Sequence, residues 1–564
     1  MARNSYGVNF GGRRIVHPGG YDSIDGNAMT SVSPGGLNLP IVVGTSDAGR
    51  QNSIQYFSDL ESARSYLRGG SILTALEIMF SPSSEGGGGA SLVGVQIVNP
   101  TTQASLIAGG LAQTSNEFGV GGNRIQAKLE DGTLSGSKKY TVSRWDLSDL
   151  EIYDNVGTVM QVQYTGSQLY AAITVDAVNG VASSLITKIG ADSASSQVDL
   201  TLDLTSSRFA TIDDIVTYIS SVSGYTAKLL NVKSSGLPSS TLDSVSAISI
   251  LGPYNVMALK GDLAYQISNS SQLVTIATSS APISNFGLTY FSGGSVGATP
   301  ASWAVYFDAI KKEFSDILVV LSSDAAIHAE ALAHVGSMVN RNQKQMLFTG
   351  GGTGETPDRA KQRVVGLNSS RAVLGYPGIF HGANGGKIPL PAYYTGALIA
   401  GRVSGVPFSE PVTFDYVSVL GLENNLIVGD PDIDDLITSG VCTLEKVQGG
   451  GIRIVQGITT YLGSNNSLYR EISSRRGADA LSETVRSTLE AKFVGKKGIR
   501  ATSSAVTTTV IDILEQAIRD TDIVLYRNIA VRITSGIIYV DYEVAQAEPT
   551  NFILVTTHFV PTTL

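Results

Sequence analysis

The sequence predicts a multidomain chain of mixed α/β and α+β class, and three observations carry that prediction. Short apolar runs typical of buried strands alternate with helical patterns in two separate blocks, 37–100 and 288–385. Between them, residues 101–287 hold short β-like runs separated by Ser, Gly and Asp turns. Strand–helix alternation is typical of parallel sheets, so we expect the two blocks to form one α/β core that a mostly β insertion splits.

The two blocks supply the expected core strands. In the first block, the apolar runs at 39–44 and 92–98 flank a helical pattern, which predicts a βαβ unit. In the second block, three further apolar runs alternate with helical patterns, at 317–321, 346–348 and 371–374.

The last part of the chain predicts a C-terminal α+β domain with an antiparallel sheet. One helical pattern places apolar residues at steps of four from Leu481 to Phe493, and a second spans 506–519. Two β runs then flank the turn at 534–536, with the period-2 alternation of a half-buried strand. The domains expected are an N-terminal arm at 1–36, the core at 37–100 plus 288–385, the insertion at 101–287, the C-terminal domain at 386–545 and a C-terminal arm or strand at 546–564.

Composition narrows the class of function. The 564 residues include only 15% charged residues, below the roughly 25% of an average soluble protein, which favours surface that ends against other protein. The net charge of -9 disfavours direct nucleic-acid binding. The single cysteine, Cys442, excludes an intrachain disulfide, and no apolar run approaches the roughly 20 residues of a membrane span.

The motifs that resemble catalytic or ligand sites are incomplete. Ser295 lies in a G-x-S-x-G pattern, but three residues separate it from the next helix start, whereas a nucleophile elbow places the serine at the turn. The glycine-rich run at 349–356 has Glu where a phosphate loop has Lys. His328 and His334 are six residues apart rather than the four of a zinc protease. We therefore expect no enzyme, no catalytic or metal residues and no cofactor.

Charge is distributed unevenly near the C-terminus. Residues 446–500 hold ten basic and four acidic residues. Such a cluster is either a solvated basic helix or a dock for an acidic partner surface. The insertion is acidic by contrast, with ten basic and fifteen acidic residues over 101–300.

Five segments, in this order, resemble the contractile tail sheath proteins of tailed phages and related injection devices. LPIVVGTSDAG resembles the opening domain of that family, GVGGNRIQAKLE the stretch before its inserted domain, and LTYFSGGSVGATPASW the return to its core. GIRIVQGITTYLG and RNIAVRITSGIIYVDYEVAQAEPTNFILVTTHFV resemble its C-terminal domain.

The resemblance implies a structural subunit that polymerises as stacked hexameric rings around a tail tube and contracts to drive the tube through a host envelope for genome ejection. The implied partners are further copies of the chain, the tail tube protein, and baseplate and tail terminator proteins, with no direct nucleic acid and no membrane insertion. The implied location is the virion, after assembly in the host cytoplasm. The alternatives are another self-assembling virion or surface protein, such as an adhesin or tube-like subunit, and a serine hydrolase that uses Ser295.

The resemblance also turns the charge pattern into candidate interaction residues. Weak, screened charge contacts suit a sheath that must release its tube, so we expect tube-facing residues among Arg475, Arg476, Lys492, Lys496 and Lys497. The first 20 residues hold three arginines and no acid, and residues 541–564 hold three acids and no Lys or Arg. Inter-subunit arm contacts are expected from Arg3, Arg13, Arg14, Asp541, Glu543, Glu548, Phe552 and Leu554.

Overall fold

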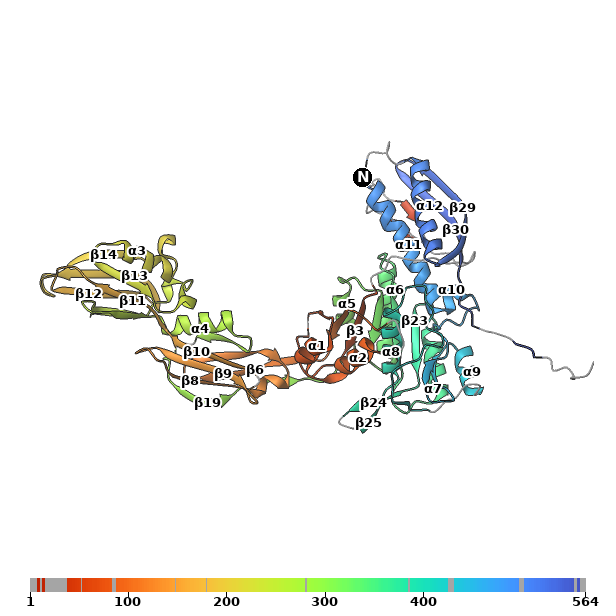
Figure 1. Ribbon diagram of the computed structural model, residues 1–564, viewed down its shortest axis with the longest axis horizontal. Coiled ribbons are helices and arrows are strands. Elements are labelled where there is room, and N and C mark those ends of the chain that lie inside the picture. Colours follow the sequence, from red (N-terminus) through yellow and green to blue (C-terminus); the bar gives the residue numbers. More distant parts are fainter. Residues whose placement is uncertain are drawn as a thin grey trace, which may run out of the picture. The chain divides into compact units, whose positions relative to one another are not determined.

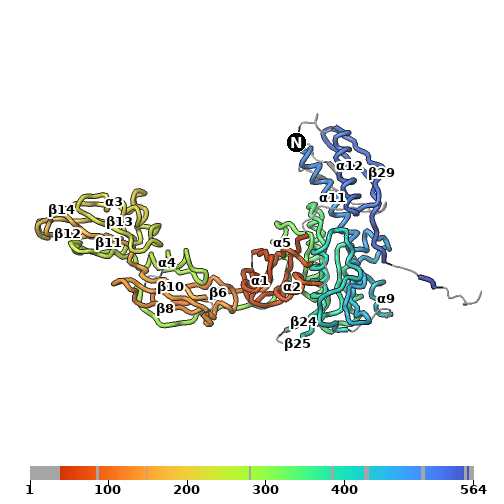
Figure 2. The backbone as a smooth tube through the Cα atoms, in the orientation of Figure 1, coloured from red at the N-terminus to blue at the C-terminus, as the bar shows by residue number. Residues whose placement is uncertain are grey.

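The computed structural model divides the chain into two compact units, which Figure 2 traces by residue number. The first unit comprises Met1–Ser46, Gln51–Pro100 and Ala298–Leu564, and the second comprises Asp47–Arg50 and Thr101–Gly297. The structure describes residues 8–10, 13–15, 38–51, 53–83, 88–147, 149–178, 180–278, 281–383, 386–424, 431–496, 502–551 and 555–557.

An eight-stranded sheet forms the centre of the first unit, in the strand order β28-β27-β23-β22-β21-β3-β5-β4. The parallel strands are β3 (Pro40–Gly44), β5 (Val93–Ile97), β21 (Ile317–Val320), β22 (Met346–Gly350), β23 (Ala372–Tyr376) and β27 (Cys442–Lys446). The antiparallel edge strands are β4 (Gln55–Phe57) and β28 (Ile452–Ile454). Strand β3 pairs with both β5 and β21, so the two sequence blocks form one sheet, and the predicted split α/β core is confirmed.

Helices cover both faces of this sheet, which explains why its strands are apolar without alternation (Figure 1). Neighbouring residues of β3 divide between two cores, because Val42 belongs to one and Ile41 and Val43 to the other. One core includes α1 (Leu60–Leu67), α2 (Gly70–Phe80) and α8 (Tyr393–Ser404). The other includes α5 (Ala304–Ile310), α6 (Ala325–Val339), α7 (Pro357–Leu367) and α9 (Pro431–Thr438).

Helix α8 lies unusually close to its neighbours because glycine leaves room. A Cβ at Gly396 would meet the Thr349 carbonyl oxygen at 2.4 Å, and one at Gly401 would meet the Met79 Cα at 2.6 Å. Any larger residue at these two positions would push α8 off β22 and α2. A small three-stranded sheet is formed by strands on either side of α8 in the sequence. Strands β24 (Ile379–Ala383) and β25 (Gly386–Leu390) come before α8, and β26 (Gly421–Leu422) comes after it.

The C-terminal part of the first unit is smaller than the sequence predicts. The predicted boundary between residues 385 and 386 is wrong, because β27, β28 and α8 all belong to the central sheet and its cores. A separate small core begins only in the second half of the next long helix, at Leu481. The elements after β28 are α10 (Ser467–Arg470), α11 (Ile472–Phe493), α12 (Ser503–Arg519) and the antiparallel hairpin of β29 (Ile523–Thr534) and β30 (Ile537–Gln546). A short hairpin near the N-terminus joins β1 (Val8–Phe10) and β2 (Arg13–Ile15).

The second unit is mostly β and contains two cores. Helix α4 (Leu259–Ser270) and two four-stranded sheets enclose one core, with strands β6 (Thr101–Ala108), β7 (Leu111–Phe118), β8 (Ile125–Asp131), β9 (Lys138–Arg144), β10 (Leu150–Val156), β18 (Val274–Thr278), β19 (Phe286–Tyr290) and β20 (Ser295–Val296). Helix α3 (Ile212–Ser221) and a further pair of sheets enclose the other, with strands β11 (Thr158–Tyr164), β12 (Tyr170–Val178), β13 (Val181–Gly190), β14 (Gln197–Asp203), β15 (Tyr225–Leu229), β16 (Val245–Ser249) and β17 (Tyr254–Met257).

The second unit ends later than the predicted insertion. Strand β19 pairs with β8, and β20 pairs with β6, so the chain stays in this unit through Gly297 rather than leaving it at residue 287. The apolar run at 286–291 therefore belongs to the β unit, although it resembles a core strand in sequence. Within the described residues, no helix is long and apolar enough to cross a membrane.

Candidate functional site: the polar junction at the start of helix α11

Three polar residues stand just before strands of the central sheet, at its amino-terminal edge. They are Asn38, two residues before β3, Asp316 before β21, and Arg371 before β23. Because these strands are parallel, their amino ends share one edge. The Leu39 N–H donates to Asp316 Oδ1 at 2.7 Å, which joins the starts of β3 and β21.

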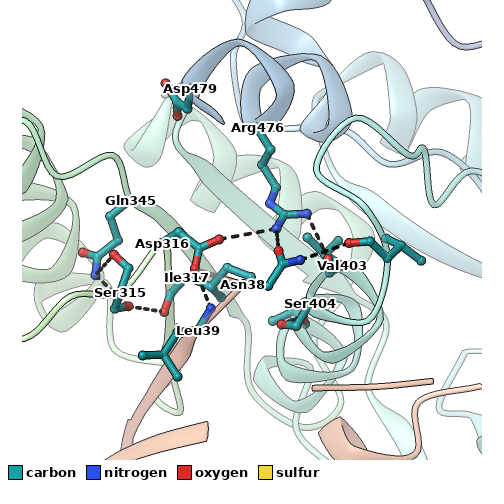
Figure 3. Close-up of polar contacts among 12 residues, drawn as sticks. Asn38, Leu39, Ser315, Asp316, Ile317, Gln345, Val403, Ser404, Arg476 and Asp479 are labelled. Carbon is teal, nitrogen blue, oxygen red and sulfur yellow. Dashed lines mark hydrogen bonds and ion pairs between the residues drawn. The ribbon is translucent and has the colours of Figure 1, made fainter. Parts of the chain in front are cut away.

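Arg476 of α11 reaches into this edge from the C-terminal part of the chain (Figure 3). Its guanidinium donates to the Val403 carbonyl oxygen at 2.9 Å, to Asp316 Oδ2 at 3.4 Å and to Asn38 Oδ1. The guanidinium also lies over the Phe408 ring, 4.6 Å from its centroid. Burial raises the pKa of the Asp316 carboxyl, and Arg476 and the Leu39 N–H offset only part of that rise. Arg476 therefore links α8 to the starts of β21 and β3.

A second ion cluster holds α11 against the start of β23. Arg371 donates two hydrogen bonds to the Asp479 carboxylate, at 2.6 and 2.8 Å, and Arg475 donates a third at 2.8 Å. Burial works to raise the pKa of Asp479, but the guanidinium groups of Arg371 and Arg475 outweigh it and hold that pKa well below its usual range. A carboxylate between two buried guanidiniums stays charged at neutral pH, so this cluster of ion pairs (the clamp) holds α11 against the start of β23.

Glu471, the residue that joins α10 to α11, contacts the other end of the chain. The side-chain amides of Gln456 and Asn551 both donate to its Oε1, at 2.7 and 3.0 Å. Nearby, the Gln546 side chain donates to the Ser474 carbonyl oxygen at 3.1 Å, and the Ser467 hydroxyl donates to Glu548 at 2.9 Å. Burial raises the pKa of the Glu471 carboxyl, and the two amide donors offset only part of that rise. The first turns of α11 thus hold residues from both ends of the chain.

The structure separates the five residues predicted to face a tube. Arg475 and Arg476, predicted among the tube-facing residues, are only 5% and 4% exposed in the subunit, and their guanidiniums are bonded inside it. Lys492 and Lys496 are exposed, and Lys492 Nζ lies 3.5 Å from the Thr509 hydroxyl of α12. Lys497 lies outside the described residues.

The predicted arm residues fall into described and undescribed groups. Asp541 is exposed on β30, Glu543 pairs with Arg527 of β29 at 2.6 Å, and Glu548 is the Ser467 partner noted above. Arg13 and Arg14 lie on β2, of which the structure describes only the backbone. Arg3, Phe552 and Leu554 lie outside the described residues.

The motifs set aside in the sequence are structural where the chain is described. Ser295 lies on β20 rather than at a strand-to-helix turn, and its hydroxyl lies 2.8 Å from that of Thr102. His328 lies 2.9 Å from the Thr349 hydroxyl, and burial lowers the pKa of both His328 and His334 to about 4. No cluster of three or more His, Cys, Asp or Glu side chains able to hold a metal occurs among the described residues.

Sequence reasoning missed the residues that complete the junction, namely Asn38, Asp316, Arg371 and Glu471. Three of them share a signal that was available: each is a polar residue at or next to the start of a buried apolar run. In a parallel sheet such residues collect at one edge, where a long helix with basic residues can bind them.

Comparisons with known proteins agree with this architecture. Residues 297–460 match the family model "Phage tail sheath protein central domain". The chain is 54% identical to the tail sheath protein of Bacillus phage SP01, over all of this chain and 99% of that protein. It is 28% identical to a putative tail sheath protein of Enterococcus phage phiEF24C, over 88% of each chain.

A solved structure shares the fold. The sheath tail protein from Desulfitobacterium hafniense superposes with a TM-score of 0.56 at 12% identity, over 94% of this chain and 97% of that one. The full-length match at 54% identity shows family membership, and with it the hydrolase alternative falls away. The chain therefore belongs to the tail sheath proteins of contractile bacteriophage tails, which are structural components of the virion and not enzymes.

Proposed function

We propose that this subunit polymerises as stacked hexameric rings around a tail tube, and that contraction of the polymer drives the tube through the host envelope for genome ejection. Family membership along the whole chain is the observation that carries the proposal. Head-to-tail contacts between identical subunits build open helical polymers of this kind. The partners that follow are further copies of the chain, the tail tube protein, and the baseplate and tail terminator proteins at the two ends of the sheath.

The hairpin β29–β30 is the proposed site of linkage between subunits. Within the described residues, its two strands form a sheet of their own. Apolar residues of the hairpin pack on α11 and α12, which anchors the hairpin to the subunit. An extended segment of a neighbouring subunit could add to this small sheet through main-chain hydrogen bonds.

The two chain ends are the segments we propose for this linkage. The basic N-terminal residues Arg3, Arg13 and Arg14 oppose the acidic residues Asp541, Glu543 and Glu548 in charge. This opposition favours contact between unlike ends, although salt screens the effect. Glu543 is already paired with Arg527 inside the subunit, so Asp541 is the carboxylate of β30 best placed to act on a neighbour.

The exposed lysines at the end of α11 are the proposed contacts with the tube. With Arg475 and Arg476 buried, the proposal is confined to Lys492 and Lys496, together with Lys497. Exposed charge pairs contribute about 0–1 kcal/mol each and weaken with salt, which suits a contact that must be released on contraction. The second unit, with its own two cores, is proposed to face outward and to be dispensable for polymerisation.

Cryo-electron microscopy of the purified chain, mixed with its tube protein, tests the proposal. Helical tubes with sixfold rings are expected, and replacing Thr101–Gly297 by a short linker should still permit them. Single particles only, or a ring of another order, would contradict the hexameric sheath. Lys492→Glu with Lys496→Glu should give sheath-only tubes without bound tube protein, and retained tube binding would contradict the tube-facing assignment.

A further inference from the structure

Two segments far apart in the sequence, one just before β3 and one just after β30, meet at the start of α11. Asn38, two residues before β3, binds Arg476, and Asn551, five residues after β30, binds Glu471. Positions 471 and 476 are separated by about 7.5 Å along a helix axis. The segments that lead toward the two ends of the chain therefore attach within about one and a half helical turns of each other.

The attachment of the N-terminal end is dense and fully bonded. The Asn38 side chain accepts from Arg476 and donates to the Val406 carbonyl oxygen at 3.3 Å, while the next residue, Leu39, donates to Asp316 at 2.7 Å (Figure 3). Arg476 in turn binds Asp316 and Val403. Loss of the Asn38 side chain would leave the buried Arg476 with one partner fewer, at a cost to the local structure of α11.

The attachment of the C-terminal end is buried but incompletely bonded. Glu471 and Gln546 are only 4% and 6% exposed. Three buried acceptor atoms there have no hydrogen-bond partner among the described residues, namely Glu471 Oε2, Gln546 Oε1 and Asn551 Oδ1. A buried polar group without a partner costs free energy, so this end is held less firmly than the other. Its remaining bonds depend on Glu471 and Ser474 keeping their helical positions.

The stretch between the two attachments is continuous hydrogen-bonded backbone. Arg475 N–H donates to the Glu471 carbonyl oxygen at 3.1 Å, and Ile472 N–H donates to that of Gly457 at 3.0 Å. Farther along the helix, Asp479 binds Arg371 at the start of β23, and this ion pair lies outside residues 471–476. Opening of residues 471–476 can therefore release both ends without detaching the rest of α11.

We propose that residues 38–39, 471–476 and 546–551 open and close as one cooperative unit, so that the two ends of the chain are held or released together. Local structure in proteins opens in such contiguous units, with free energies below that of global unfolding. The inference builds on the proposed role of the ends as links between subunits. When a subunit loses its contact with a neighbour at one end, its other end would then be held less firmly. The loss of one contact between subunits would therefore weaken the next contact along the sheath.

Hydrogen–deuterium exchange of the unpolymerised full chain tests the coupling. Asn38 adopts a positive φ of 44°, so Asn38→Gly removes the side chain without backbone strain. Losing the hydrogen bond from Arg476 to the Asn38 side chain should accelerate the exchange of backbone amides roughly three- to fivefold. We expect this acceleration both at 471–476 and at the remote segment 546–551. In the reverse direction, Asn551→Ala should accelerate exchange at Leu39 and Arg476 by a similar factor.

Two further variants separate coupling from general loosening. Asn38→Asp keeps the acceptor for Arg476 but loses the donor to the Val406 carbonyl oxygen, so exchange at 546–551 should be slower than in Asn38→Gly and faster than in the wild type. Glu490→Gln, in the second half of the same helix, should leave both ends unchanged. Amides of β21 to β23 should exchange at the wild-type rate in all four variants. Acceleration confined to the mutated end, or at neither end, would overturn the coupling. The exchange experiment uses the unpolymerised chain. If the chain formed no tubes, the proposed function would be contradicted, but the coupling between the two ends could still be measured.

Discussion

The two halves of helix α11 carry the same kinds of charged residue in opposite environments. In the first half, Arg475, Arg476 and Asp479 are each 7% exposed or less, and Arg476 and Asp479 bind partners from distant segments of the chain. In the second half, Arg486 pairs with Glu483 and Glu490 on the same helix, and Lys492 is exposed. The difference shows that tertiary partners, rather than the density of basic residues, decide which charges hold the fold and which are free for a binding surface.

The largest effect is expected from Asp479→Asn in the first half. The substitution keeps the side-chain shape but leaves Arg371 and Arg475 without their anion, so the free energy of unfolding should fall by about 3–5 kcal/mol. Urea unfolding followed through the buried Trp303, in a Trp145→Phe background that removes the second tryptophan, measures it. Glu490→Gln, in the second half, is the matched control. A loss below about 1 kcal/mol for Asp479→Asn would show that the clamp contributes little.

Acidification from pH 7 to pH 5 should leave the contribution of Asp479 to the unfolding free energy unchanged, but it should remove much of the contributions of the buried histidines His328 and His334. Asp479 has a folded pKa far below its unfolded value of about 4, so its contribution is present above pH 4 and is lost only below that. His328 and His334 have folded pKa values of about 4 against an ordinary 6.5, so the stability they contribute is present above pH 6.5 and is lost as pH falls toward 4. Each histidine should therefore cost about 2 kcal/mol of unfolding free energy by pH 5.

A single substitution checks that assignment. His334→Leu replaces the imidazole that packs on the Phe307 ring with an apolar side chain and removes the contribution of this histidine. The loss of unfolding free energy between pH 7 and 5 should then be about 2 kcal/mol smaller than in the wild type. An unchanged pH dependence would show that His334 does not titrate as inferred.

A smaller effect is expected from Arg486→Ala in the second half of α11. The carboxylates described as pairing with it, those of Glu483 and Glu490, lie on the same helix, and the Glu490 side chain is 40% exposed, so water replaces much of what is lost. The free energy of unfolding should fall by about 0.5–1 kcal/mol. A loss above about 2 kcal/mol in the same urea experiment would mean that the two halves of the helix do not differ as described.

The smallest effect on the isolated subunit is expected from Lys492→Glu. The side chain is exposed, and the unfolding free energy should stay within about 0.5 kcal/mol of the wild type. Binding to the tube protein, measured by co-sedimentation at low salt, should nevertheless weaken at least severalfold. Unchanged sedimentation would remove Lys492 from the proposed tube surface.

Much of the core was predictable because its strands are apolar runs bounded by glycine or polar residues. The runs at 39–44, 317–321 and 346–348 all became central strands, since a parallel sheet covered on both faces needs continuous apolar sequence. The same signal misplaced 288–291 in the core, because β19 belongs to the β unit. An apolar run indicates a buried strand but does not say which sheet takes it.

The junction could not be assembled from sequence spacing. Asn38 and Arg476 are 438 residues apart, and Arg371 and Asp479 are 108 apart. Ion pairs over such separations depend on the order of strands in the sheet, which local periodicity does not contain. Arg475 and Arg476 looked like a solvated pair for this reason: their anions, Asp479 and Asp316, come one from the next helical turn and one from another block of the chain.

Deletion of residues 1–20 is the most direct test of the central claim, that this subunit folds by itself and is linked into a sheath through its ends. The account predicts a soluble monomer whose thermal unfolding matches that of the full chain, because the junction begins at Asn38, beyond the deletion. Electron microscopy at equal protein concentration should show tubes from the full chain and none from the truncated one. Normal tubes from the truncated protein would contradict the account and show that other surfaces hold the lattice together.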